Sequence, residues 1–493
     1  MHASESEERP SKGRPTVLIY TTDVVAERMA GPGIRAMRFA EALAPVAEVR
    51  LVAQHTAELR RDDFVIDTAT GDDLLEHIRW ADVVIVQYPI FSVMPEVLDT
   101  DTIWVVDLYD PFLLEQLQQG LYIESTDQVA SARWTVDGVN EMLLNADFII
   151  CASEKQRDMW IGQLSSLGRL NPQTYRADPS LRNLIDVVPF GVDEAAPVKT
   201  RPGIRGVVDG ISETDRVLLW GGGIYDWFDP LTLIRAVAQV SARHDDLRLF
   251  FLATQNANPL HGTMKMATDA IALADELGVL GRSVFFNETW VPHTERANYF
   301  LDADVGVSTH LDHLETAFSF RTRLLDYLWA GLPIINSAGD AFERDIVDRQ
   351  LGAVVAPGDV GELAAAIEAL LYDEAAAATA RRNVEQFAPA LYWSHATRNL
   401  VRFCTNAQRA ADAGLAAQRR VDARSTAETQ ASQLASAELA RQRAVDVAEA
   451  ARAEAARLAA TADELRARVG DLEASTSWRV TAPLRAVTRL VKR

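Results

Sequence analysis

Short, largely apolar runs of strand length alternate with helical patterns through most of the first 389 residues of this 493-residue chain. Val17–Tyr20 and Val83–Gln87 are such runs, and helical spacing of apolar residues appears over Leu74–Arg79 and Val129–Asn145. Strands that alternate with helices imply βαβ units and a parallel sheet with helices on both faces. Further strand candidates are 49–53, 103–108, 148–152, 217–220, 247–253, 284–287, 305–308 and 333–336.

The alternation pauses at Val187–Asp193 and in the Pro-, Gly- and charge-rich segment Glu194–Arg216, and then restarts. The predicted fold class is therefore α/β, with two doubly wound, Rossmann-like domains facing a cleft. We assign residues 16–195 to the first domain and residues 196–389 to the second. Ligands of such sheets bind at the carboxyl ends of the strands, which places the expected site in the cleft.

The C-terminal hundred residues differ from the rest in composition. The chain has 26 Gly and 19 Pro, but only Gly414, Gly470 and Pro483 follow Pro389. Because these helix breakers are so rare there, we expect the chain to be helical without interruption from about Ala390. Within residues 405–475, small or apolar residues recur at alternating steps of four and three residues. This spacing is typical of the seam of a coiled coil, which would form a homodimer. The alternative is a solitary helix with a charged surface. The seam positions are 444, 448, 451, 455, 458, 462, 465, 469 and 472.

Residues 476–493 form a basic tail. From Ala474 to Arg493 there are five basic residues and no acidic one, and apolar residues fall on one helical face behind Trp478. A basic amphipathic helix with a Trp is typical of segments that bind an anionic membrane surface, so we predict that Trp478–Arg493 does so. The alternative is docking on an acidic partner or on the acidic body of the protein.

The net charge of −21 argues against nucleic-acid binding, which needs a basic surface. Two cysteines cannot form a disulfide framework and fit a reducing compartment. Residues 1–15 are polar and predict a disordered tail, not a signal peptide, and no apolar run is long enough to span a membrane. We therefore expect a cytoplasmic protein, peripheral at the inner face of the plasma membrane if the basic tail binds lipid.

Two glycine clusters lie where a strand end would meet the cleft. Gly31 and Gly33 open a predicted helix, and Gly222 and Gly223 follow the strand candidate 217–220. Missing side chains let the backbone approach a ligand closely, and helix N-termini favour phosphate. A purely structural turn is the alternative explanation for each cluster.

The segment Leu314–Ser337 (LETAFSFRTRLLDYLWAGLPIINS) carries the strongest chemical signal. Arg321 and Arg323 fall near a predicted helix start, where cations oppose the helix dipole. A bound diphosphate would remove that conflict. Asp326, one turn further on, is set to accept hydrogen bonds from two ribose hydroxyls. The alternative is that both arginines are solvated and Asp326 pairs with one of them.

Residues 16–404 resemble a known family, the retaining GT-B glycosyltransferases of the large bacterial polysaccharide mannosyl- and glucosyltransferase group. The resemblance implies that a nucleotide-diphosphate sugar binds mainly to the second domain and the acceptor mainly to the first. It also implies that a helix at 390–404 completes the first domain, and that neither a cofactor nor a metal is needed. The matching motifs are VVPFGVD (187–193), ADVGVS (303–308) and RLLDYLWAGLPII (323–335).

The resemblance assigns roles position by position. Asp326 takes the place of a glutamate that holds the nucleotide ribose, and Arg323 falls near the diphosphate. The backbone at 318–320, including Ser319 and Phe320, would face the donor sugar and phosphates, and Val291 would lie near the base. Gly31 and Gly33 would approach the diphosphate from the first domain.

The sequence departs from the family pattern at two places. Relatives commonly carry an acid eight positions before Asp326, whereas here the nearest acid is Glu315, a candidate contact to donor hydroxyls. Relatives often place an Arg and a Lys after the Gly-rich strand, but Gly221–Pro230 contains no cation, so Arg321 and Arg323 would stabilise the leaving diphosphate as the catalytic charges. In the family the leaving phosphate helps to deprotonate the acceptor, with retention at the anomeric carbon. Asp107 and Asp110 are candidate acceptor contacts, or alternatively strand caps.

His310 and His313 lie close to two acids, but His-x-x-His on a loop is weak evidence for a metal. We expect no metal, and predict instead that one of these histidines lines the cleft as a hydrogen-bonding group.

The leading hypothesis is a glycosyltransferase that moves a hexose to a glycan or lipid-linked acceptor in cell-surface polysaccharide biosynthesis. The alternatives are a catalytically inactive GT-B scaffold acting through its coiled coil, and a sugar-nucleotide epimerase.

Overall fold

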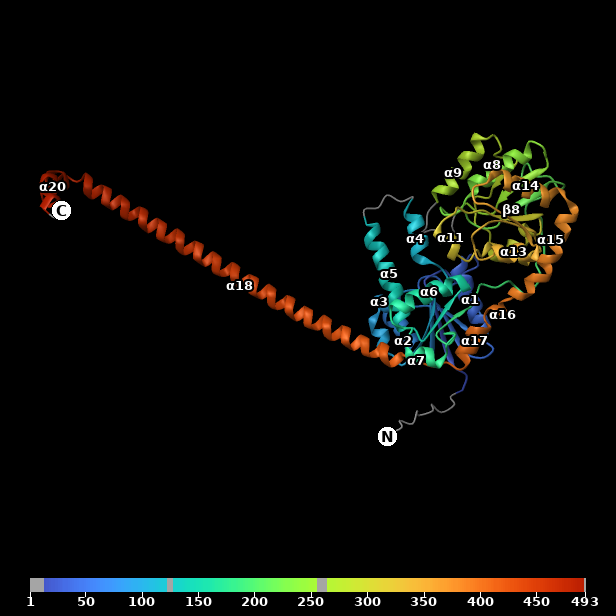
Figure 1. Ribbon diagram of the computed structural model, residues 1–493, viewed down its shortest axis with the longest axis horizontal. Coiled ribbons are helices and arrows are strands. Elements are labelled where there is room, and N and C mark those ends of the chain that lie inside the picture. Colours follow the sequence, from blue (N-terminus) through green and yellow to red (C-terminus); the bar gives the residue numbers. More distant parts are fainter. Residues whose placement is uncertain (1–12, 122–126, 255–263, 492–493) are drawn as a thin grey trace. The chain divides into compact units, whose positions relative to one another are not determined.

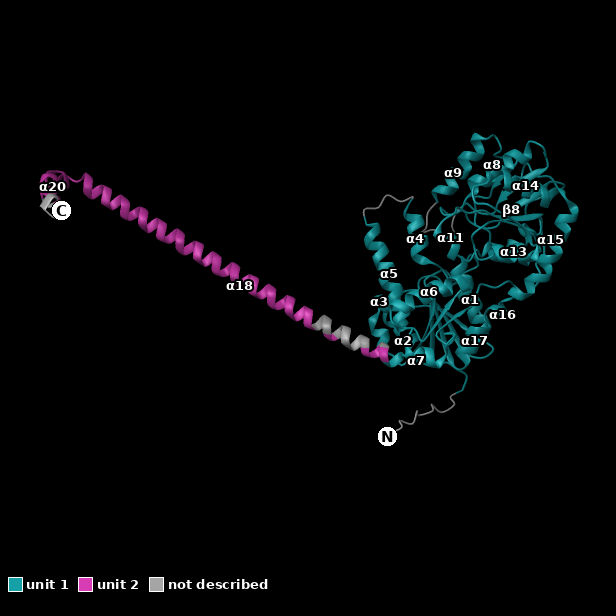
Figure 2. Ribbon diagram, viewed as in Figure 1, with its two compact units in different colours: residues 1–414 teal, residues 415–493 magenta. Residues whose placement is uncertain are grey.

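The computed structural model describes residues 13–121, 127–254 and 264–491. The chain divides into two compact units, Met1–Gly414 and Leu415–Arg493 (Figures 1 and 2). Residues 1–12, most of the predicted disordered tail, lie outside the described residues, as do Lys492 and Arg493 of the basic tail. No helix in the described part of the chain is long and apolar enough to cross a bilayer.

The first half of unit 1 is built on a seven-stranded parallel sheet of order β3-β2-β1-β4-β5-β6-β7. Every residue of β4 is buried, as expected for a strand covered by helices on both faces. The strands are β1 (Thr16–Thr21), β2 (Glu48–Ala53), β3 (Val65–Thr68), β4 (Val83–Val86), β5 (Ile103–Asp107), β6 (Phe148–Cys151) and β7 (Ile185–Val187). The helices are α1 (Gly31–Leu43), α2 (Gly71–Trp80), α3 (Ile90–Val93), η1 (Pro95–Asp99), α4 (Phe112–Gly120), α5 (Gln128–Asn145), α6 (Glu154–Ser166) and α7 (Pro172–Ala177).

The second half repeats the plan with a six-stranded parallel sheet of order β10-β9-β8-β11-β12-β13. The predicted α/β class with two doubly wound halves is therefore confirmed. The strands are β8 (Arg216–Trp220), β9 (Leu247–Phe251), β10 (Val284–Phe286), β11 (Val305–Ser308), β12 (Ile334–Ser337) and β13 (Gly352–Val355). The helices are α8 (Pro230–Ser241), α9 (Lys265–Glu276), η3 (His293–Glu295), α10 (Arg296–Phe300), α11 (Leu314–Phe318), α12 (Arg323–Trp329), α13 (Glu343–Arg349), α14 (Val360–Tyr372) and α15 (Glu374–Phe387).

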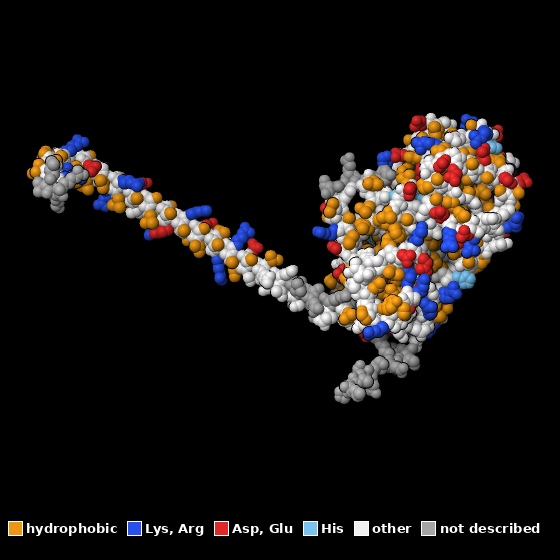
Figure 3. All heavy atoms as spheres, viewed as in Figure 1, with side chains coloured by type: hydrophobic (Ala, Val, Ile, Leu, Met, Phe, Trp, Pro, Cys, Tyr) orange, Lys and Arg blue, Asp and Glu red, His pale blue; other side chains and the backbone are white. Residues whose placement is uncertain are grey.

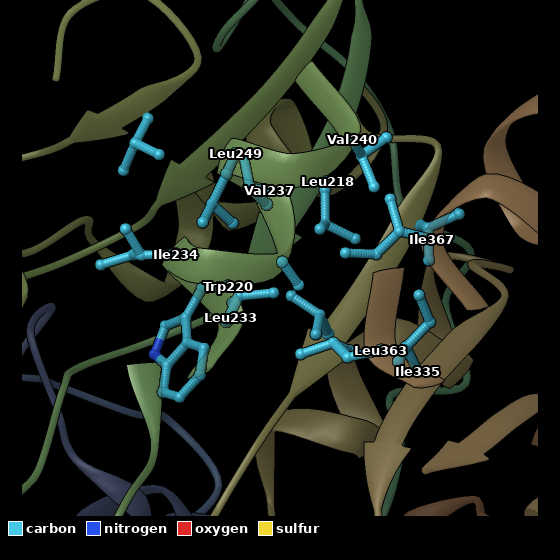
Figure 4. Close-up of a cluster of buried hydrophobic side chains, with 14 of the residues drawn as sticks. Leu218, Trp220, Leu233, Ile234, Val237, Val240, Leu249, Ile335, Leu363 and Ile367 are labelled. Atoms are coloured by element: carbon cyan, nitrogen blue, oxygen red, sulfur yellow. The ribbon is translucent and has the colours of Figure 1, made fainter. Parts of the chain in front are cut away.

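Alternate residues of β8 supply two different hydrophobic cores. Leu218 and Trp220 point to one face of the sheet, where they pack with Leu233 of α8 and Ile367 of α14 (Figure 4). Val217 and Leu219, which alternate with them along the strand, belong to the cluster on the other face. Because side chains alternate along a strand, each face is fixed by one set of residues, and the register of the strand is set by burial.

After α15 the chain returns to the first half through η4 (Ala388–Leu391), α16 (Trp393–Ala396) and α17 (Arg398–Thr405). Leu400 and Cys404 are buried in the core cluster that also contains β1 and α1 side chains. The Phe403 ring stacks on Phe148 of β6 at 4.3 Å between centroids. The last helices of unit 1 thus pack on its first sheet.

The expected uninterrupted helix from Ala390 is wrong, because residues 406–412 are not helical. This segment is held by side-chain contacts. Asp412 accepts two hydrogen bonds, of 2.8 and 2.9 Å, from Arg169, and both side chains are buried. Arg409 donates to the Thr102 carbonyl at 2.6 Å and to Asp147 at 3.1 Å. These ion pairs fix a non-helical conformation in residues that contain neither Gly nor Pro.

Unit 2 is almost entirely helical. It contains nearly all of α18 (Ala413–Ala474), followed by α19 (Thr476–Val480) and α20 (Ala482–Val491). In the part of α18 that is coloured in the space-filling view, hydrophobic side chains are interspersed with charged ones (Figure 3). The long helix expected from the scarcity of Gly and Pro is present, and it ends at Ser475, whose side chain caps α19 by accepting a hydrogen bond from Trp478 N.

Candidate functional site

A cavity of about 590 Å³ lies between the two halves of unit 1. Its walls are the segments that follow the carboxyl ends of strands in both sheets, which is where doubly wound folds bind ligands. Residues from the first half are 22–23, 29–32, 34, 87, 109–110, 112, 115, 119 and 190–193; the second half and the returning segment add 221–223, 225, 227–228, 252–253, 264, 290–291, 293, 296, 300, 319–323, 325–326, 329 and 393. The expected cleft is therefore present.

The Gly221–Gly223 loop gives the cavity a wall of bare backbone. A Cβ at Gly221 would lie 2.8 Å from the Phe300 ring, closer than packing allows. Gly222 has a φ of 118°, a conformation that side chains disfavour. Both Gly222 and Gly223 line the cavity, as predicted. The hydroxyl of Tyr327, on α12, accepts a hydrogen bond from Gly221 N at 2.8 Å and so ties the loop to that helix.

Arg323, the first residue of α12, presents a buried cation to this loop. Its Nη2 donates to the Gly223 carbonyl at 2.9 Å, and its guanidinium carbon lies 4.2 Å from the Trp220 ring centre and 4.1 Å from that of Phe228. Within the described residues Nη1 has no hydrogen-bond partner and no acid pairs with the guanidinium. Burial lowers the pKa of Arg323 to about 10. A desolvated cation with an unused donor at a cavity wall is suited to an anionic ligand.

Arg321 lines the same cavity, but an acid inside the protein already neutralises it. Its Nη1 and Nη2 donate to the two carboxylate oxygens of Glu315 at 3.0 and 2.8 Å. Glu315 is fully buried, does not line the cavity, and also accepts a hydrogen bond from Ser319 Oγ. The expectation that Glu315 contacts donor hydroxyls therefore needs correction, because its carboxylate lies behind Arg321 and is fully engaged by it.

Asp326 stands one helical turn after Arg323 on α12 and lines the cavity. Its Oδ1 accepts a hydrogen bond from Arg296 Nε at 3.0 Å, whereas no described residue donates to Oδ2. One third of the side chain is exposed. Burial raises the pKa of this carboxyl, and the Arg296 guanidinium opposes the shift. The free oxygen can accept hydrogen bonds from a ligand hydroxyl.

The sequence interpretation missed the ion pairs that hold Asp326. Arg296 lies between Asp326 and Asp193 and stacks over the Trp329 ring at 4.1 Å. Asp193 also pairs with Arg38 of α1, so that its pair with Arg296 links the second half to α1 of the first half. Asp193 ends the VVPFGVD motif, a signal that could have found it, whereas the spacing around Arg296 indicates only a helix. Of the remaining predicted residues, Val291, Ser319 and Phe320 line the cavity.

On the first half, Gly31 lines the cavity but Gly33 does not. Gly33 N donates to Asp23 Oδ2 at 3.1 Å, and a Cβ there would lie 2.5 Å from the Val24 carbonyl oxygen. Gly33 is thus needed for close packing of the loop against α1, and the expected ligand contact is replaced by a contact within the protein.

Asp107 is also inaccessible to a ligand. It is fully buried, accepts hydrogen bonds of 2.7 and 2.8 Å from Arg35, and takes a third of 3.0 Å from Gln87. The proposed acceptor contact at Asp107 is therefore corrected to a structural ion pair. Asp110, three residues later, does line the cavity.

Asp110 forms a hydrogen-bonded carboxyl pair with Glu115 of α4 at the first-half wall of the cavity. Burial raises the pKa of Asp110 to about 7, and burial together with the neighbouring Asp110 raises that of Glu115 well above its usual range. Two carboxyl groups that share a proton can both donate and accept hydrogen bonds. Glu115 carried no signal in the sequence beyond its place in a helical pattern.

Neither histidine of the His310–His313 segment lines the cavity, contrary to expectation. His310 is fully buried, with Asp340 3.5 Å from its Nε2. His313 caps α11, since its Nδ1 accepts from Thr316 N at 3.3 Å. Among the residues that the structure describes, no group of three or more His, Cys, Asp or Glu is arranged to hold a metal.

Comparison with known proteins finds a family model that matches part of the second half, and solved structures of the same fold. Residues 215–373 match the family model described as glycosyl transferases group 1, and no curated protein sequence is significantly similar to the chain. Solved structures with the same fold include WaaG, a glycosyltransferase involved in lipopolysaccharide biosynthesis (18% identity, TM-score 0.54, 79% of this chain and 99% of that one). Sucrose-phosphate synthase from Thermosynechococcus elongatus (17%, TM-score 0.53, 79% and 98%) is similar in the same way.

A third similar structure is HepE from Anabaena in complex with UDP-glucose (13% identity, TM-score 0.54, 80% of this chain and all of that one). Identities this low establish the fold alone, and the fold they share is the two-sheet GT-B architecture. The matched segment contains Gly221–Gly223, Arg321, Arg323 and Asp326, the residues of the second-half wall. Residues 215–373 thus resemble the glycosyl transferases group 1 family, and the chain has the GT-B fold.

Proposed function

We propose that this protein is a glycosyltransferase that uses a nucleoside-diphosphate sugar, bound in the cavity between the halves of unit 1. The observation that carries the proposal is Arg323, a buried guanidinium with an unpartnered Nη1 at the cavity wall and no acid paired with it among the described residues. A diphosphate would supply the missing countercharge. The family match over residues 215–373 supports the same class of substrate.

In this proposal each wall residue binds one part of the donor. Arg323 and the Gly222–Gly223 backbone hold the diphosphate, and Asp326 accepts hydrogen bonds from the ribose hydroxyls. Val291 lies toward the base, and Ser319 and Phe320 toward the sugar and phosphates. Because the cation is already desolvated and fixed between two aromatic rings, little reorganisation is needed when charge develops on the leaving diphosphate.

Glu315 acts through Arg321 in this arrangement. The buried carboxylate fixes both Nη atoms of Arg321 and leaves its Nε without a partner among the described residues. Arg321 thus adds a rigid but largely neutralised group beside Arg323. Transfer with retention at the anomeric carbon, in which the departing phosphate accepts the acceptor proton, fits a site where the protein supplies charge and orientation.

The first half of the cavity is the proposed acceptor side. Gly31 and the Asp110–Glu115 carboxyl pair line the cavity from that half, and Arg323 and Asp326 line it from the second half. Carboxyl groups of this kind are suited to hydroxyl-rich acceptors such as a glycan. Several solved structures of the same fold carry UDP or UDP-glucose, so UDP-hexoses are the first donors to test.

The proposed setting is the cytoplasmic face of a membrane, where a lipid-linked glycan would be the acceptor in cell-surface polysaccharide biosynthesis. In α20, Leu484 and Val487 are 70% and 62% exposed. Arg485 stacks on Trp478 at 3.6 Å, which places a cation beside an aromatic ring. This combination of exposed apolar and basic groups supports binding to an anionic lipid surface.

Turnover tests the proposal. Purified protein is incubated with UDP-, GDP- and ADP-hexoses, with and without a lipid-linked oligosaccharide fraction, and released nucleoside diphosphate is measured. We expect release that depends on acceptor and is reduced at least about tenfold in Arg323→Ala, the loss of one charged hydrogen-bonding group. Donor conversion without acceptor would indicate an epimerase instead.

A catalytically inactive scaffold is the second candidate. It is favoured by the pairing of Arg321 with Glu315 and by the absence of a cation between Gly223 and Pro230. A scaffold would bind the nucleotide without releasing diphosphate from any donor and acceptor pair. Binding without turnover across the donor panel would therefore support this candidate and exclude the enzyme.

A further inference from the structure

The second half of α18 carries an exposed line of apolar side chains, which we call the seam. It consists of residues 444, 448, 451, 455, 458, 462, 465, 469 and 472, all Ala, Leu or Val. Leu458, Leu465, Val469 and Leu472 are between 53% and 61% exposed. Leucine and valine side chains that gather on one helix face at the C-terminal end of the seam are costly to leave in water, so this part of the seam favours a partner surface.

We propose that a second copy of this chain covers the seam, in a parallel, in-register two-stranded coiled coil over residues 444–472. The proposal does not depend on the proposed enzymatic function. The alternating spacing of four and three residues averages 3.5 per turn, and this period keeps one stripe facing a partner when two helices supercoil with a left-handed twist. On a straight helix the same stripe would drift by about 20° per heptad, so a flat partner surface would meet the whole seam less well than a second, supercoiled helix.

The size of the seam residues supports a close pair of helices. The first positions are alanines, which let two helices approach closely, and the last three d positions of the heptad are Leu458, Leu465 and Leu472. Leucine at d is typical of two-stranded parallel coils. The strongest contacts are therefore expected toward the C-terminal end of the seam.

Charged residues beside the seam favour the parallel direction. In a parallel pair, Arg468 at position g meets Glu473 at position e of the partner's next heptad, and the pair occurs twice by symmetry. In the antiparallel alignment that pairs the same seam, Arg452 of one chain would face Arg466 of the other. Only opposite charges meet in the first arrangement, whereas in the second the like-charged pair of Arg452 and Arg466 offsets the attractive pair of Glu454 and Arg468.

The start of α18 is tied to the first half of unit 1. Asp412, the residue before α18, forms the buried ion pair with Arg169, and Asn171 Nδ2 also donates to it at 2.9 Å. Arg409 is held by Asp147. The seam is consequently joined, through the start of α18, to the half that carries the proposed acceptor side.

Cross-linking of the full-length protein tests both the pairing and its direction. Ala451→Cys places a thiol at a seam position where the two copies of a parallel coil face each other. Ala453→Cys is the matched control, because position 453 faces away from the seam. The native cysteines, Cys151 and Cys404, are buried and give little background. We expect disulfide-linked dimers from Ala451→Cys under mild oxidation, and at least about tenfold fewer from Ala453→Cys.

Three results would overturn the proposal. One is equal cross-linking of the two variants. Another is linkage that appears only when Ala451→Cys is mixed with Val469→Cys, the pattern of an antiparallel coil. The third is a wild-type mass by light scattering of 54.3 kDa at every concentration tested, where the proposal expects twice that value.

A second pair of variants keeps the test independent of thiol chemistry. Leu465→Glu places a charge in the seam, whereas Ala467→Glu places the same charge on the outer face of the helix. The seam variant is expected to be monomeric at concentrations where the outer variant is dimeric. Equal masses for the two would contradict the proposal, and nucleotide binding in the cavity should be the same in both.

Discussion

At the scale of single residues, the arginines around the cavity differ in what neutralises them. Arg296 lies between Asp193 and Asp326, and Arg321 is bound at both Nη atoms by Glu315. Arg323 instead has two aromatic rings and one carbonyl oxygen as neighbours among the described residues. The charge that remains available to a ligand is therefore that of Arg323.

The buried pair of Glu315 and Arg321 makes a prediction about stability. Glu315→Ala leaves a buried guanidinium without its countercharge, which costs about 3–5 kcal/mol. We expect thermal unfolding at a clearly lower temperature, and a partial recovery when Arg321→Ala is added. Glu276→Ala, at an exposed helical position, is the control. A Glu315→Ala protein as stable as wild type, with only its donor KM raised, would show that Glu315 contacts the sugar directly.

The carboxyl group of Asp110 predicts a pH dependence. Its folded-state pKa of about 7 lies above the ordinary value of 3.8, so the folded protein binds this proton more tightly than the unfolded chain does. The contribution of Asp110 to the free energy of unfolding is present below pH 4 and is lost as pH rises through 7. We expect Asp110→Asn to flatten the fall in thermal stability over this window. An unchanged pH profile would contradict the assigned pKa.

At the scale of elements, α12 and the Gly221–Gly223 loop are held together by hydrogen bonds and form one wall of the cavity. Tyr327, on the buried face of α12, accepts from Gly221 N and donates to the Val307 carbonyl at 2.7 Å. The same helix presents Arg323 and Asp326 to the cavity. A single helix, packed on β8 and β11, thus sets the positions of the Arg323 cation, the Asp326 carboxylate and the backbone of the glycine loop.

Removing the Tyr327 hydroxyl tests this coupling. Tyr327→Phe leaves buried backbone groups of β8 and β11 without their partner, at a cost of about 1–3 kcal/mol. We expect a lower unfolding temperature together with weaker nucleotide binding, because the glycine loop loses its tie to α12. Tyr175→Phe, at an exposed tyrosine in α7, controls for loss of a hydroxyl. Normal nucleotide affinity in the destabilised variant would show that the loop is positioned by other contacts.

Most elements could be predicted from sequence because their signals are local. The continuous apolar run of β4 and the helical spacing of α14 are readable in a window of a dozen residues. Strands β3 and β13 were missed because only one of the four residues of each is buried, and β7 because it has only three residues. The break at 406–412 was missed because it is imposed by Arg169 and Asp147, far away in sequence.

The same distinction between local signals and contacts distant in sequence explains which residues of the site could be predicted. Arg323 and Asp326 share one helix, so their spacing alone predicted a common wall. Asp107 was misassigned because its partner, Arg35, is 72 residues away, and the ion pair that buries both exists only in the fold. Arg296 and Glu115 were missed for a related reason: they reach the cavity through tertiary packing of helices whose spacing carries no chemical signal.

At the scale of the whole molecule, the proposed dimer would strengthen the proposed membrane binding of the basic tail. A parallel coil over residues 444–472 brings both α20 helices to the same end of the dimer, so two tails can bind one surface. Linked binding sites gain apparent affinity without new contacts. The basic tail of one chain, by contrast, binds with its own affinity alone.

Vesicle binding tests this connection. On vesicles of phosphatidylcholine with phosphatidylglycerol, we expect Leu465→Glu to bind at least about tenfold more weakly than Ala467→Glu, since the former loses the second tail. Val487→Glu, on the exposed apolar face of α20, should weaken binding in either background. Equal vesicle affinity for the two α18 variants would separate dimerisation from membrane binding.

The most direct test of the account is calorimetric titration of nucleoside diphosphates into wild type, Arg323→Ala and Arg344→Ala. Arg344 is an exposed arginine of α13, outside the cavity lining, and serves as the matched control. Among UDP, GDP and ADP, the nucleotide that wild type binds most tightly should bind Arg344→Ala equally well. It should bind Arg323→Ala at least about tenfold more weakly, a loss of about 1.4 kcal/mol or more. Equal affinity for all three proteins, or no binding of any nucleotide to wild type, would contradict a diphosphate site at Arg323.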